Sequence, residues 1–445
     1  MQNEKNSMRK DLIGATIKEI KNERHAAVSV LLEIGQQGAY NNIALRRVLD
    51  AQTQWQPYQK AFVTELVNGT LRNRILIDHI IDSYSRKPSS KMKPFIRELL
   101  RTGVYQILRM DKVPPSAAVN EAVKLARANG FSALSGFVNG ILRNIVRGHE
   151  DGTLLMPQDL GLKYSYPNWL VKALTKWLGA EGAKEFCAAS HVPPPVTICT
   201  NLLKTSRDAL MLELETSGIK CTKSDLAGPC LHLERTSDIT ASKSYRQGHF
   251  FVMDENAYIA AAATLAGPGR KMIDLCAAPG GKSFACAGLM ENCGQIIASD
   301  IHPHKVSLIK NTAGRLGISC ITAEERDAAT VNPAWENWAD IVLLDAPCSG
   351  LGVIRKKPDI KYTKTFEDIK SMAAYQRTLL SAAAGYVRPG GVLVYSTCTV
   401  SKEENEDNVR WFLDNFPYDP DGPALKMNGF FTARLIRKKT LHIHN

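Results

Sequence analysis

The sequence lacks long apolar runs, internal repeats of fixed period and low-complexity tracts. No apolar stretch approaches the roughly 20 residues that a membrane-spanning helix needs. The opening stretch, MQNEKNSMRKDL, has no hydrophobic core of the kind found in signal peptides. We therefore expect a cytoplasmic protein without a membrane partner, and the 44% hydrophobic content favours packed cores over disorder.

Cysteine is missing from the beginning of the chain: all ten cysteines occur from Cys187 onward, and none forms a CxxC pair. This spacing favours neither a zinc site nor a disulfide framework. His302 and His304 flank no cysteine cluster, so we predict that they are surface residues and that the protein holds no metal. Most of the thiols should be buried and inert, and only Cys348 and Cys398 stand out by their surroundings.

Acidic residues are too few to balance the basic ones. The formal net charge is +12 over 445 residues, and residues 1–150 alone hold 23 Lys+Arg against 13 Asp+Glu, a difference of +10. This excess predicts either a solvated helical surface or a footprint for nucleic acid. The length itself is typical of about three domains.

Residues 8–150 carry apolar side chains at helical spacing, which predicts a helical bundle. The stretches KPSS (87–90) and VPPS (113–116) should separate helices, because proline disfavours helix in the residue before it. We expect three basic residues between the apolar stripes to point outward, namely Arg97, Arg101 and Arg109.

The rest of the chain changes from mixed to strongly periodic. Residues 151–245 combine a linker with alternating segments such as VTICTNLL (196–203), which predicts a small α/β module. Residues 246–440 repeat a strand, a turn and a helix-length stretch. This order predicts an α/β domain built on a mostly parallel, doubly wound sheet.

Three predicted strands end in residues that suit a nucleotide-like cofactor. The first strand leads into a turn of small residues, which lets backbone amides approach a ligand closely. The predicted cofactor contacts in and beside this turn are Cys276, Ala277, Ala278, Pro279, Gly280, Gly281 and Lys282. Asp300 ends the second strand, where an acidic side chain can bind a ribose diol, and Asp327 follows the third. Taken singly, each aspartate could equally be a helix cap or a surface turn.

The glycine turn fits two common alternatives poorly. NAD-binding folds use GxGxxG, and this turn reads APGGK instead. The stretch GGKS resembles the end of a phosphate-binding loop, but Cys276 occupies the position where that loop needs its first glycine. S-adenosyl-L-methionine fits better.

Cys348 and Cys398 each lie where an apolar strand breaks into a turn, in LLDAPCSGLG (343–352) and VYSTCTV (394–400). Ligands meet catalytic groups at the carboxyl ends of such strands. A lone cysteine at a strand end is more often part of the core. Two such turns on neighbouring predicted strands reverse that preference, and a thiol-dependent methyl transfer becomes the leading hypothesis.

The stretches DLCAAPGGK (274–282), DAPCSG (345–350) and YSTCT (395–399) resemble, in this order, the signatures of RNA (cytosine-5) methyltransferases that use S-adenosyl-L-methionine. VPPSAAVNEAVKLA (113–126) and GFVNGILRNIVR (136–147) are similar to the NusB-like domain of the RsmB family, bacterial 16S ribosomal RNA methyltransferases. The resemblance covers nearly the whole chain. It implies an α + α/β protein with a NusB-like RNA-binding bundle, a small middle module and a Rossmann-like methyltransferase domain.

The resemblance also implies the reaction and its residues. Carbon 5 of cytosine accepts a methyl group only after a thiolate has added at carbon 6, and a second group must then help to release the adduct. By resemblance, Cys398 is the nucleophile and Cys348 assists release. Asp345 should bond the cytosine ring and also belongs to the cofactor pocket. The implied partner is 16S ribosomal RNA, free or in early assembly intermediates, and the protein is expected to be a monomer.

Several readings stay open. The same chemistry could serve transfer RNA or DNA, or the chain could be a NusB-like binding factor with a vestigial catalytic domain. Ser401 and Glu404 predict a capping box. The basic loop at 355–359 could contact RNA or face solvent. The segment 416–439 is short, with Asn428 where the family commonly has aspartate, which predicts an abbreviated final strand pair.

Overall fold

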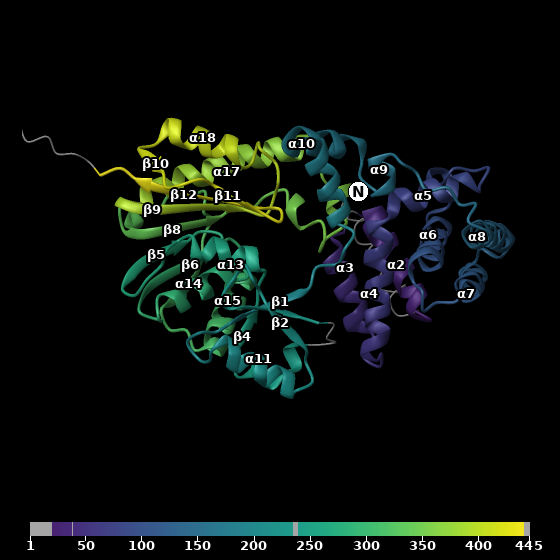
Figure 1. Cartoon of the computed structure of the whole chain (residues 1–445), viewed down its shortest axis with the longest axis horizontal. Coiled ribbons are helices and arrows are strands. Elements are labelled where there is room, and N and C mark those ends of the chain that lie inside the picture. The colour runs from purple at the N-terminus through teal and green to yellow at the C-terminus, as the bar shows by residue number, and fades with distance from the viewer. Residues whose placement is uncertain (1–19, 38, 235–238, 440–445) are drawn as a thin grey trace, which may run out of the picture. The chain divides into compact units, whose positions relative to one another are not determined.

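The computed structural model describes residues 20–37, 39–234 and 239–439 (Figure 1). Part of the predicted bundle, residues 8–19, and the opening stretch of the sequence lie outside these residues. Within the described residues, the chain up to Val192 together with Ile354–Thr363 forms one compact unit. Pro193–Val353 and the chain from Lys364 onward form a second unit. The predicted domain boundaries at 150 and 245 stay predictions.

The first unit is helical, as predicted. Proline occupies the first position of α4, α6 and α7, where its missing N–H costs nothing. The predicted break at 87–90 lies between α5 and α6, and the one at 113–116 runs into the first turn of α7. The helices are α2 (Glu23–Gln37), α3 (Asn41–Ala51), α4 (Pro57–Arg72), α5 (Arg74–Ser83), α6 (Pro94–Arg109), α7 (Pro115–Ala128), α8 (Ser135–Glu150), α9 (Leu160–Lys163) and α10 (Asn168–Ala189), with short 3-10 turns at Ser89–Lys91 and Ser132–Leu134.

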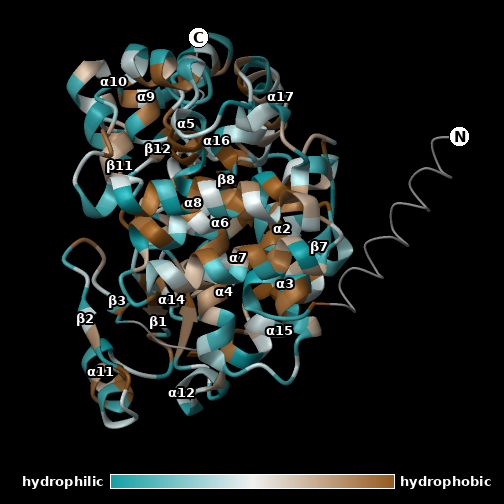
Figure 2. Cartoon of the chain, turned by 90° about the vertical axis from the view of Figure 1, so that its right-hand side faces the viewer, coloured by the Kyte–Doolittle hydropathy of each residue, from teal (hydrophilic) through white to brown (hydrophobic). Residues whose placement is uncertain are grey.

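Helix α6 lies at the centre of this unit and packs against α2, α4, α5, α7 and α8. In Figure 2, helices such as α6 and α8 carry hydrophobic segments beside hydrophilic ones, as expected of helices that bury one face. Because α6 is surrounded on most sides, several of its polar residues are buried as well, namely Glu98, Arg101, Thr102 and Gln106.

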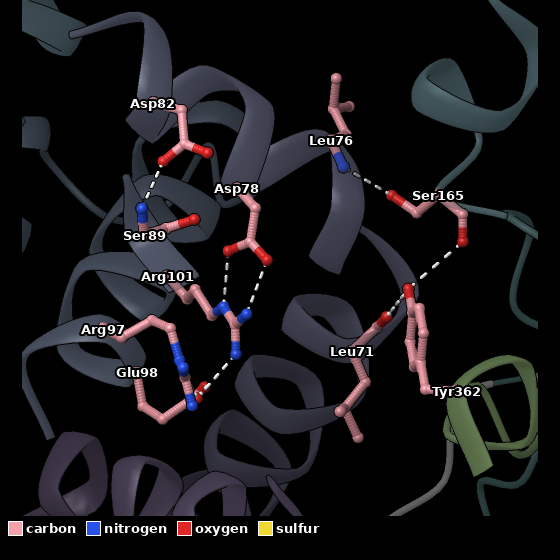
Figure 3. Close-up of polar contacts among 10 residues, drawn as sticks. All are labelled: Leu71, Leu76, Asp78, Asp82, Ser89, Arg97, Glu98, Arg101, Ser165 and Tyr362. Atoms are coloured by element: carbon pink, nitrogen blue, oxygen red, sulfur yellow. Dashed lines mark hydrogen bonds and ion pairs between the residues drawn. The ribbon is translucent and has the colours of Figure 1, made fainter. Parts of the chain in front are cut away.

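Arg101 was predicted to point outward, and the structure contradicts this. Arg101 is only 5% exposed. Its guanidinium donates to both carboxylate oxygens of Asp78, at 2.7 and 2.6 Å, and to Glu98 at 2.7 Å. These contacts are drawn in Figure 3. Arg97 is half-buried, and only Arg109 is exposed as expected. The two acidic partners compensate the buried charge of Arg101.

A segment from late in the sequence completes the first unit. Within Ile354–Thr363, which includes α16 (Ile360–Thr363), Lys361 is fully buried, and its ammonium donates to the carbonyls of Arg72 (2.9 Å) and Tyr164 (3.2 Å). The Tyr362 hydroxyl donates to the Leu71 carbonyl at 2.9 Å, a contact drawn in Figure 3. Burial lowers the pKa of Lys361 to about 7.

The basic loop that leads into α16 is therefore held by the helical unit. The Asp359 carboxylate accepts from the backbone N–H of Asn41 at 3.3 Å, and the Arg355 side chain donates to the Val192 carbonyl at 3.0 Å. Lys356 and Lys357 remain exposed. The alternatives of a solvated face and an RNA contact both stay open for these two lysines.

The second unit begins with a four-stranded antiparallel sheet in the order β2-β3-β1-β4. Apolar side chains of the sheet, such as Ile198, Leu231 and Phe250, pack against Leu210 and Leu214 of α11. The elements are β1 (Val196–Thr200), α11 (Arg207–Thr216), β2 (Cys221–Lys223), β3 (Cys230–Leu233), a 3-10 turn at Ile239–Ala241, α12 (Lys243–Arg246) and β4 (Phe250–Val252). The predicted small α/β module is confirmed.

The second sheet has eight strands in the order β10-β12-β9-β8-β5-β6-β7, with β11 paired to β12. Pairing is parallel from β9 to β7 and antiparallel at the β12 edge, which confirms the mostly parallel sheet. The elements are α13 (Glu255–Ala262), β5 (Arg270–Asp274), α14 (Gly281–Leu289), β6 (Gly294–Asp300), α15 (Pro303–Leu316), β7 (Ile321–Glu325), β8 (Ala339–Asp345), α17 (Phe366–Tyr386), β9 (Val387–Thr397), α18 (Glu406–Asn415), β10 (Tyr418–Pro420), β11 (Leu425–Met427) and β12 (Phe430–Arg437), with 3-10 turns at Pro333–Trp335 and Leu351–Val353.

Both faces of this sheet are covered by helices (Figure 1). Alternate residues of a strand enter different cores: Met272 packs with Phe284 of α14, whereas its neighbour Ile273 belongs to the core that contains Leu379 of α17. Strands buried on both faces read as continuous apolar runs, which is why the motif strands were recognisable in the sequence.

The short segment after α18 still forms strands. Asn428 and Gly429 have φ values of 46° and 87° and connect β11 to β12 as a two-residue hairpin turn. Gly429 packs so closely on Gly352 that a Cβ on Gly352 would overlap the Gly429 carbonyl. The tip of the predicted abbreviated hairpin therefore lies against the chain that follows Cys348.

Candidate active site

The Pro-Gly-Gly turn joins β5 to α14. Gly280 has a φ of 108°, and a Cβ there would overlap the Phe284 ring, so both the backbone conformation and the space require glycine. The turn opens onto the N-terminus of α14, where backbone N–H groups attract anions and acceptors. The predicted contacts Cys276, Ala277, Ala278, Pro279, Gly280 and Gly281 all lie in this turn.

Asp300 and Asp327 follow the next two strands of the sheet. Asp300 is the last residue of β6, its carboxylate accepts from the His302 N–H at 3.1 Å, and Lys305 lies 3.5 Å away. Asp327 comes just after β7 and accepts from the Ala329 N–H at 2.9 Å. Because β5, β6 and β7 are parallel neighbours, the glycine turn and both aspartates share one edge of the sheet.

Lys282 was predicted to contact the cofactor, and the structure places its ammonium on Asp345, at 2.6 Å. Asp345 also accepts from the Ser396 hydroxyl at 2.7 Å. Burial lowers the pKa of Lys282, but the charge and hydrogen bond of Asp345 outweigh this and raise it overall. Lys282 therefore stays an ammonium, and it holds Asp345 in place from the glycine turn.

A buried carboxyl lies near this ion pair and was missed in the sequence. Asp274, the last residue of β5, is fully buried and accepts from the Ser283 hydroxyl at 2.6 Å. Burial, together with the charge of Asp345, raises the pKa of Asp274 to about 7. Asp274 is part of the motif strand, but nothing in the sequence distinguishes it from an ordinary strand residue.

The two cysteines meet at the ends of β8 and β9. These strands are parallel neighbours, with Asp345 opposite Ser396, so the turns that follow them lie side by side. The sulfur atoms of Cys348 and Cys398 are 3.1 Å apart, and the Cys398 N–H donates to the Cys348 sulfur at 3.3 Å. Both residues are partly exposed.

The two thiols influence each other. The hydrogen bond with Cys398 and burial raise the pKa of Cys348 well above its usual range. A protonated Cys348 could donate to a thiolate on Cys398 across the 3.1 Å between the sulfurs. A thiol that stabilises a neighbouring thiolate is the arrangement that a cysteine nucleophile with an acid partner requires.

The predicted site residues thus form one contiguous edge of the sheet, from β7 through β6, β5 and β8 to β9. Ser396 and Asp274 belong to this edge and have no role predicted from the sequence, and Glu404, predicted to cap a helix, lies beside it. His302 and His304 are exposed, as predicted. In the part of the chain that the structure describes, no group of three or more His, Cys, Asp or Glu side chains is arranged to hold a metal ion.

Comparison with protein families matches three parts of the chain. The family described as 16S rRNA methyltransferase RsmB/F matches residues 264–420, the NusB family matches residues 21–147, and an RsmF/B-like ferredoxin-like domain matches residues 166–240.

Whole-length relatives agree with these matches. The probable ribosomal RNA small subunit methyltransferase B of Bacillus subtilis (strain 168) is 38% identical over 403 residues, covering 89% of this chain and 90% of that protein. The corresponding Synechocystis protein is 36% identical over 400 residues, covering 88% and 89%. Among solved structures, that of PH0851 has a TM-score of 0.77 at 26% identity, covering 93% of this chain and 98% of that one. A methyltransferase homologue from Pyrococcus horikoshii has a TM-score of 0.55 at 28% identity, covering 64% and 100%.

Proposed function

The chain belongs to the family of ribosomal RNA small subunit methyltransferase B proteins, and we propose that it methylates carbon 5 of a cytosine in 16S ribosomal RNA through a covalent cysteine adduct. Membership of the family makes the protein a 16S ribosomal RNA methyltransferase. The single observation that carries the finer proposal is the pair of cysteine sulfurs, 3.1 Å apart at the ends of two parallel strands.

S-adenosyl-L-methionine is the methyl donor, and it supplies an electrophilic methyl group when bound. The glycine turn fits such a ligand, because it leads into the N-terminus of α14, whose first backbone N–H groups have no partner within the helix. We expect residues 276–281 to hold its polar end, Asp300 the ribose hydroxyls and Asp327 the adenine. Asp345 borders both this pocket and the cysteines.

Cys398 is the proposed nucleophile. Its thiolate forms a bond to carbon 6 of the cytosine, and the electron pair moves to carbon 5, which then takes the methyl group. Asp345, oriented by Lys282 and Ser396, hydrogen-bonds the cytosine ring and favours this redistribution. The target base must leave its stack, since sulfur reaches carbon 6 only from the face of the ring.

Cys348 is proposed to assist release. After methyl transfer, the proton on carbon 5 passes to solvent water and the electron pair of its bond forms the double bond between carbons 5 and 6. The bond between carbon 6 and the Cys398 sulfur breaks, and its electron pair returns to sulfur. A thiol beside Cys398 can donate to that sulfur as it departs. The raised pKa of Cys348 supports this assignment, because a thiol that keeps its proton is a poor nucleophile and a usable acid.

The test uses unmodified 16S RNA, S-adenosyl-L-methionine and three forms of the protein. Wild type should convert one cytosine to 5-methylcytosine, as read by bisulfite sequencing. Cys348→Ala should accumulate a covalent RNA adduct, and Cys398→Ala should form neither adduct nor product. If Cys398→Ala retained full activity, the nucleophile assignment would be wrong.

The target RNA is tested in the same way in cells. Bisulfite sequencing of 16S RNA from a strain that lacks the protein should show the loss of one 5-methylcytosine. An unchanged pattern would redirect the proposal to transfer RNA. Among the described residues, no helix is long and apolar enough to cross a membrane. The cytoplasmic location, the monomeric state and action on assembly intermediates stay predictions.

A further inference from the structure

Glu404 is the one acidic residue of the SKEENE string (401–406) that is completely buried. The sequence predicts that it closes a capping box with Ser401, and only half of that box forms: the Ser401 hydroxyl accepts the Glu404 N–H at 3.3 Å. Helix α18 begins later, at Glu406. The carboxylate of Glu404 points elsewhere, to a turn more than fifty residues earlier in the chain.

That carboxylate contacts the turns of both cysteines. It accepts from the backbone N–H of Ser349 at 2.8 Å and from the Ser349 hydroxyl, and Ser349 is the residue directly after Cys348. The Ser349 hydroxyl also lies 2.8 Å from the hydroxyl of Thr399, the residue directly after Cys398. One buried side chain therefore ties together the two residues that follow the two thiols.

Gln376 of α17 completes the arrangement on the other side of Cys348. Its amide donates to the carbonyl of Pro347 at 2.9 Å and to the Glu404 carboxylate at 3.0 Å. Its own oxygen accepts from the Tyr395 hydroxyl at 3.1 Å. Cys348 is thus held before and after: Gln376 binds the peptide that precedes it, and Glu404 the peptide that follows.

We propose that Glu404 is the positioning residue that sets the spacing of Cys348 and Cys398, with Gln376 as its support. The inference rests on the proposed function for its catalytic consequence. Glu404 acts through the backbone of the Cys348 turn. A buried carboxylate that accepts from several donors is hard to replace, because any substitute leaves donors unsatisfied.

The positioning role of Glu404 predicts a different effect on catalysis from a general loss of stability. Displacing the Cys348 turn should harm release of the adduct more than its formation. The Glu404 carboxylate accepts directly from the peptide N–H that follows Cys348, whereas Cys398 directly follows β9, which is held by its pairing with β8 and β12. Loss of the positioning contact therefore predicts an enzyme that attacks RNA but releases it slowly, with unchanged binding of both substrates.

The experiment compares Glu404→Gln with Glu403→Gln in the full-length protein. The control removes the same charge from the neighbouring residue, whose carboxylate accepts from the Ser401 hydroxyl at 3.0 Å. With unmodified 16S RNA transcript and S-adenosyl-L-methionine, Glu404→Gln should lower kcat about tenfold or more with both KM values within about twofold of wild type, and covalent adduct should accumulate. Glu403→Gln should behave as wild type.

A second readout does not need RNA. In glutathione buffers, the ratio of reduced to oxidised glutathione at which half of the Cys348–Cys398 pair is closed as a disulfide reports how well the two sulfurs are held together. We expect Glu404→Gln to shift this ratio about tenfold against the disulfide and Glu403→Gln to leave it unchanged. If Glu404→Gln does not fold, Ser349→Ala, which removes the hydroxyl link alone, should shift both readouts in the same direction.

The two readouts separate the outcomes. Glu404→Gln with wild-type kcat, no added adduct and an unchanged glutathione ratio overturns the positioning role. A shifted ratio in a protein whose wild type makes no 5-methylcytosine supports the positioning role and overturns the proposed function. A third outcome also overturns the positioning role: kcat falls, KM for RNA rises by the same factor, and the glutathione ratio is unchanged. Glu404 would then serve RNA binding.

Discussion

At the scale of single residues, two basic side chains with little exposure lie against acidic partners. Arg101 lies between Asp78 and Glu98, and Lys282 lies on Asp345. The first pair of partners stabilises the helical core, and the second orients a proposed catalytic carboxylate. The sequence alone does not distinguish these roles, since both basic residues lie among apolar neighbours.

Removing one member of the buried cluster should be costly. Arg101→Met leaves Asp78 and Glu98 without their cation, and we expect it to destabilise the helical unit by about 3–5 kcal/mol. Arg46→Met is the control, because its ion pair with Asp50 is exposed, with side chains 84% and 70% accessible, and should change stability by no more than about 0.5 kcal/mol. Thermal unfolding of both variants measures the difference, and equal midpoints would contradict the account.

At the scale of elements, a hairpin from the end of the chain packs against the chain that follows Cys348. The hairpin tip at Gly429 packs on Gly352, whose N–H donates to the Cys398 carbonyl at 3.0 Å. Within the helical unit, α16 is anchored through Lys361 and Tyr362. Both anchors join segments that lie far apart in the sequence.

The contact of the two glycines leads to a prediction about turnover. Gly352→Ala places a methyl group where the Gly429 carbonyl lies, so the hairpin tip or the Cys348 loop must move. We expect a loss of about 1–3 kcal/mol of stability and a lower kcat. Gly314→Ala, in α15 with open space around its Cα, is the control and should be neutral or slightly stabilising. Wild-type kcat in Gly352→Ala would show that the hairpin does not support the site.

The anchor in α16 should make stability depend on pH. The pKa of Lys361 is about 7 in the folded protein and ordinarily 10.5, so between these values the unfolded chain binds one more proton. Stability should therefore rise with pH, by at most about 1.4 kcal/mol per pH unit. Unfolding measured between pH 7 and 9 should show this rise in wild type and a flatter profile in Lys361→Met. Lys124→Met, at an exposed lysine, is the control and should keep the wild-type dependence of stability on pH. Parallel stability profiles for wild type and both variants would contradict the prediction.

A feature of the structure could be predicted from the sequence where the residues that form it lie close together in the chain. The motif strands, their turns and the cysteine positions were predictable, because apolar runs and small residues occur within a few positions of each other. The roles of Arg101, Glu404 and Lys361 were not, because their partners lie 23, 55 and 289 residues away. A local rule gave Glu404 a helix cap, whereas its carboxylate binds a turn brought near by the sheet.

At the scale of the whole molecule, the net charge of +12 is the clearest sign of a polyanionic partner. In the helical unit, Arg143 and Arg147 of α8 line a cleft of about 540 Å³, together with Ser116 and Asn120 of α7. Both arginines are exposed, so they are available to phosphate groups.

The charge predicts how RNA affinity responds to salt. The logarithm of the affinity for 16S RNA should fall linearly with the logarithm of salt concentration, because bound basic residues release counterions. Replacing Arg143 and Arg147 by Gln should weaken binding and reduce the slope by up to about 2. Filter binding at salt concentrations between 50 and 200 mM measures this dependence. We expect the affinity to change about 10-fold or more over that range. An affinity that does not change with salt would exclude an electrostatic footprint.

The central claim is that Cys398 attacks carbon 6 of a cytosine in 16S RNA, and one trapping measurement tests it most directly. In RNA transcribed with 5-fluorocytidine, carbon 5 carries fluorine in place of the proton that must leave, so the adduct cannot break down. Incubation with S-adenosyl-L-methionine, digestion and mass spectrometry should find a methylated fluorocytosine joined to the Cys398 peptide, also in Cys348→Ala and never in Cys398→Ala. An adduct on Cys348, or none on either cysteine with RNA bound, would contradict the account.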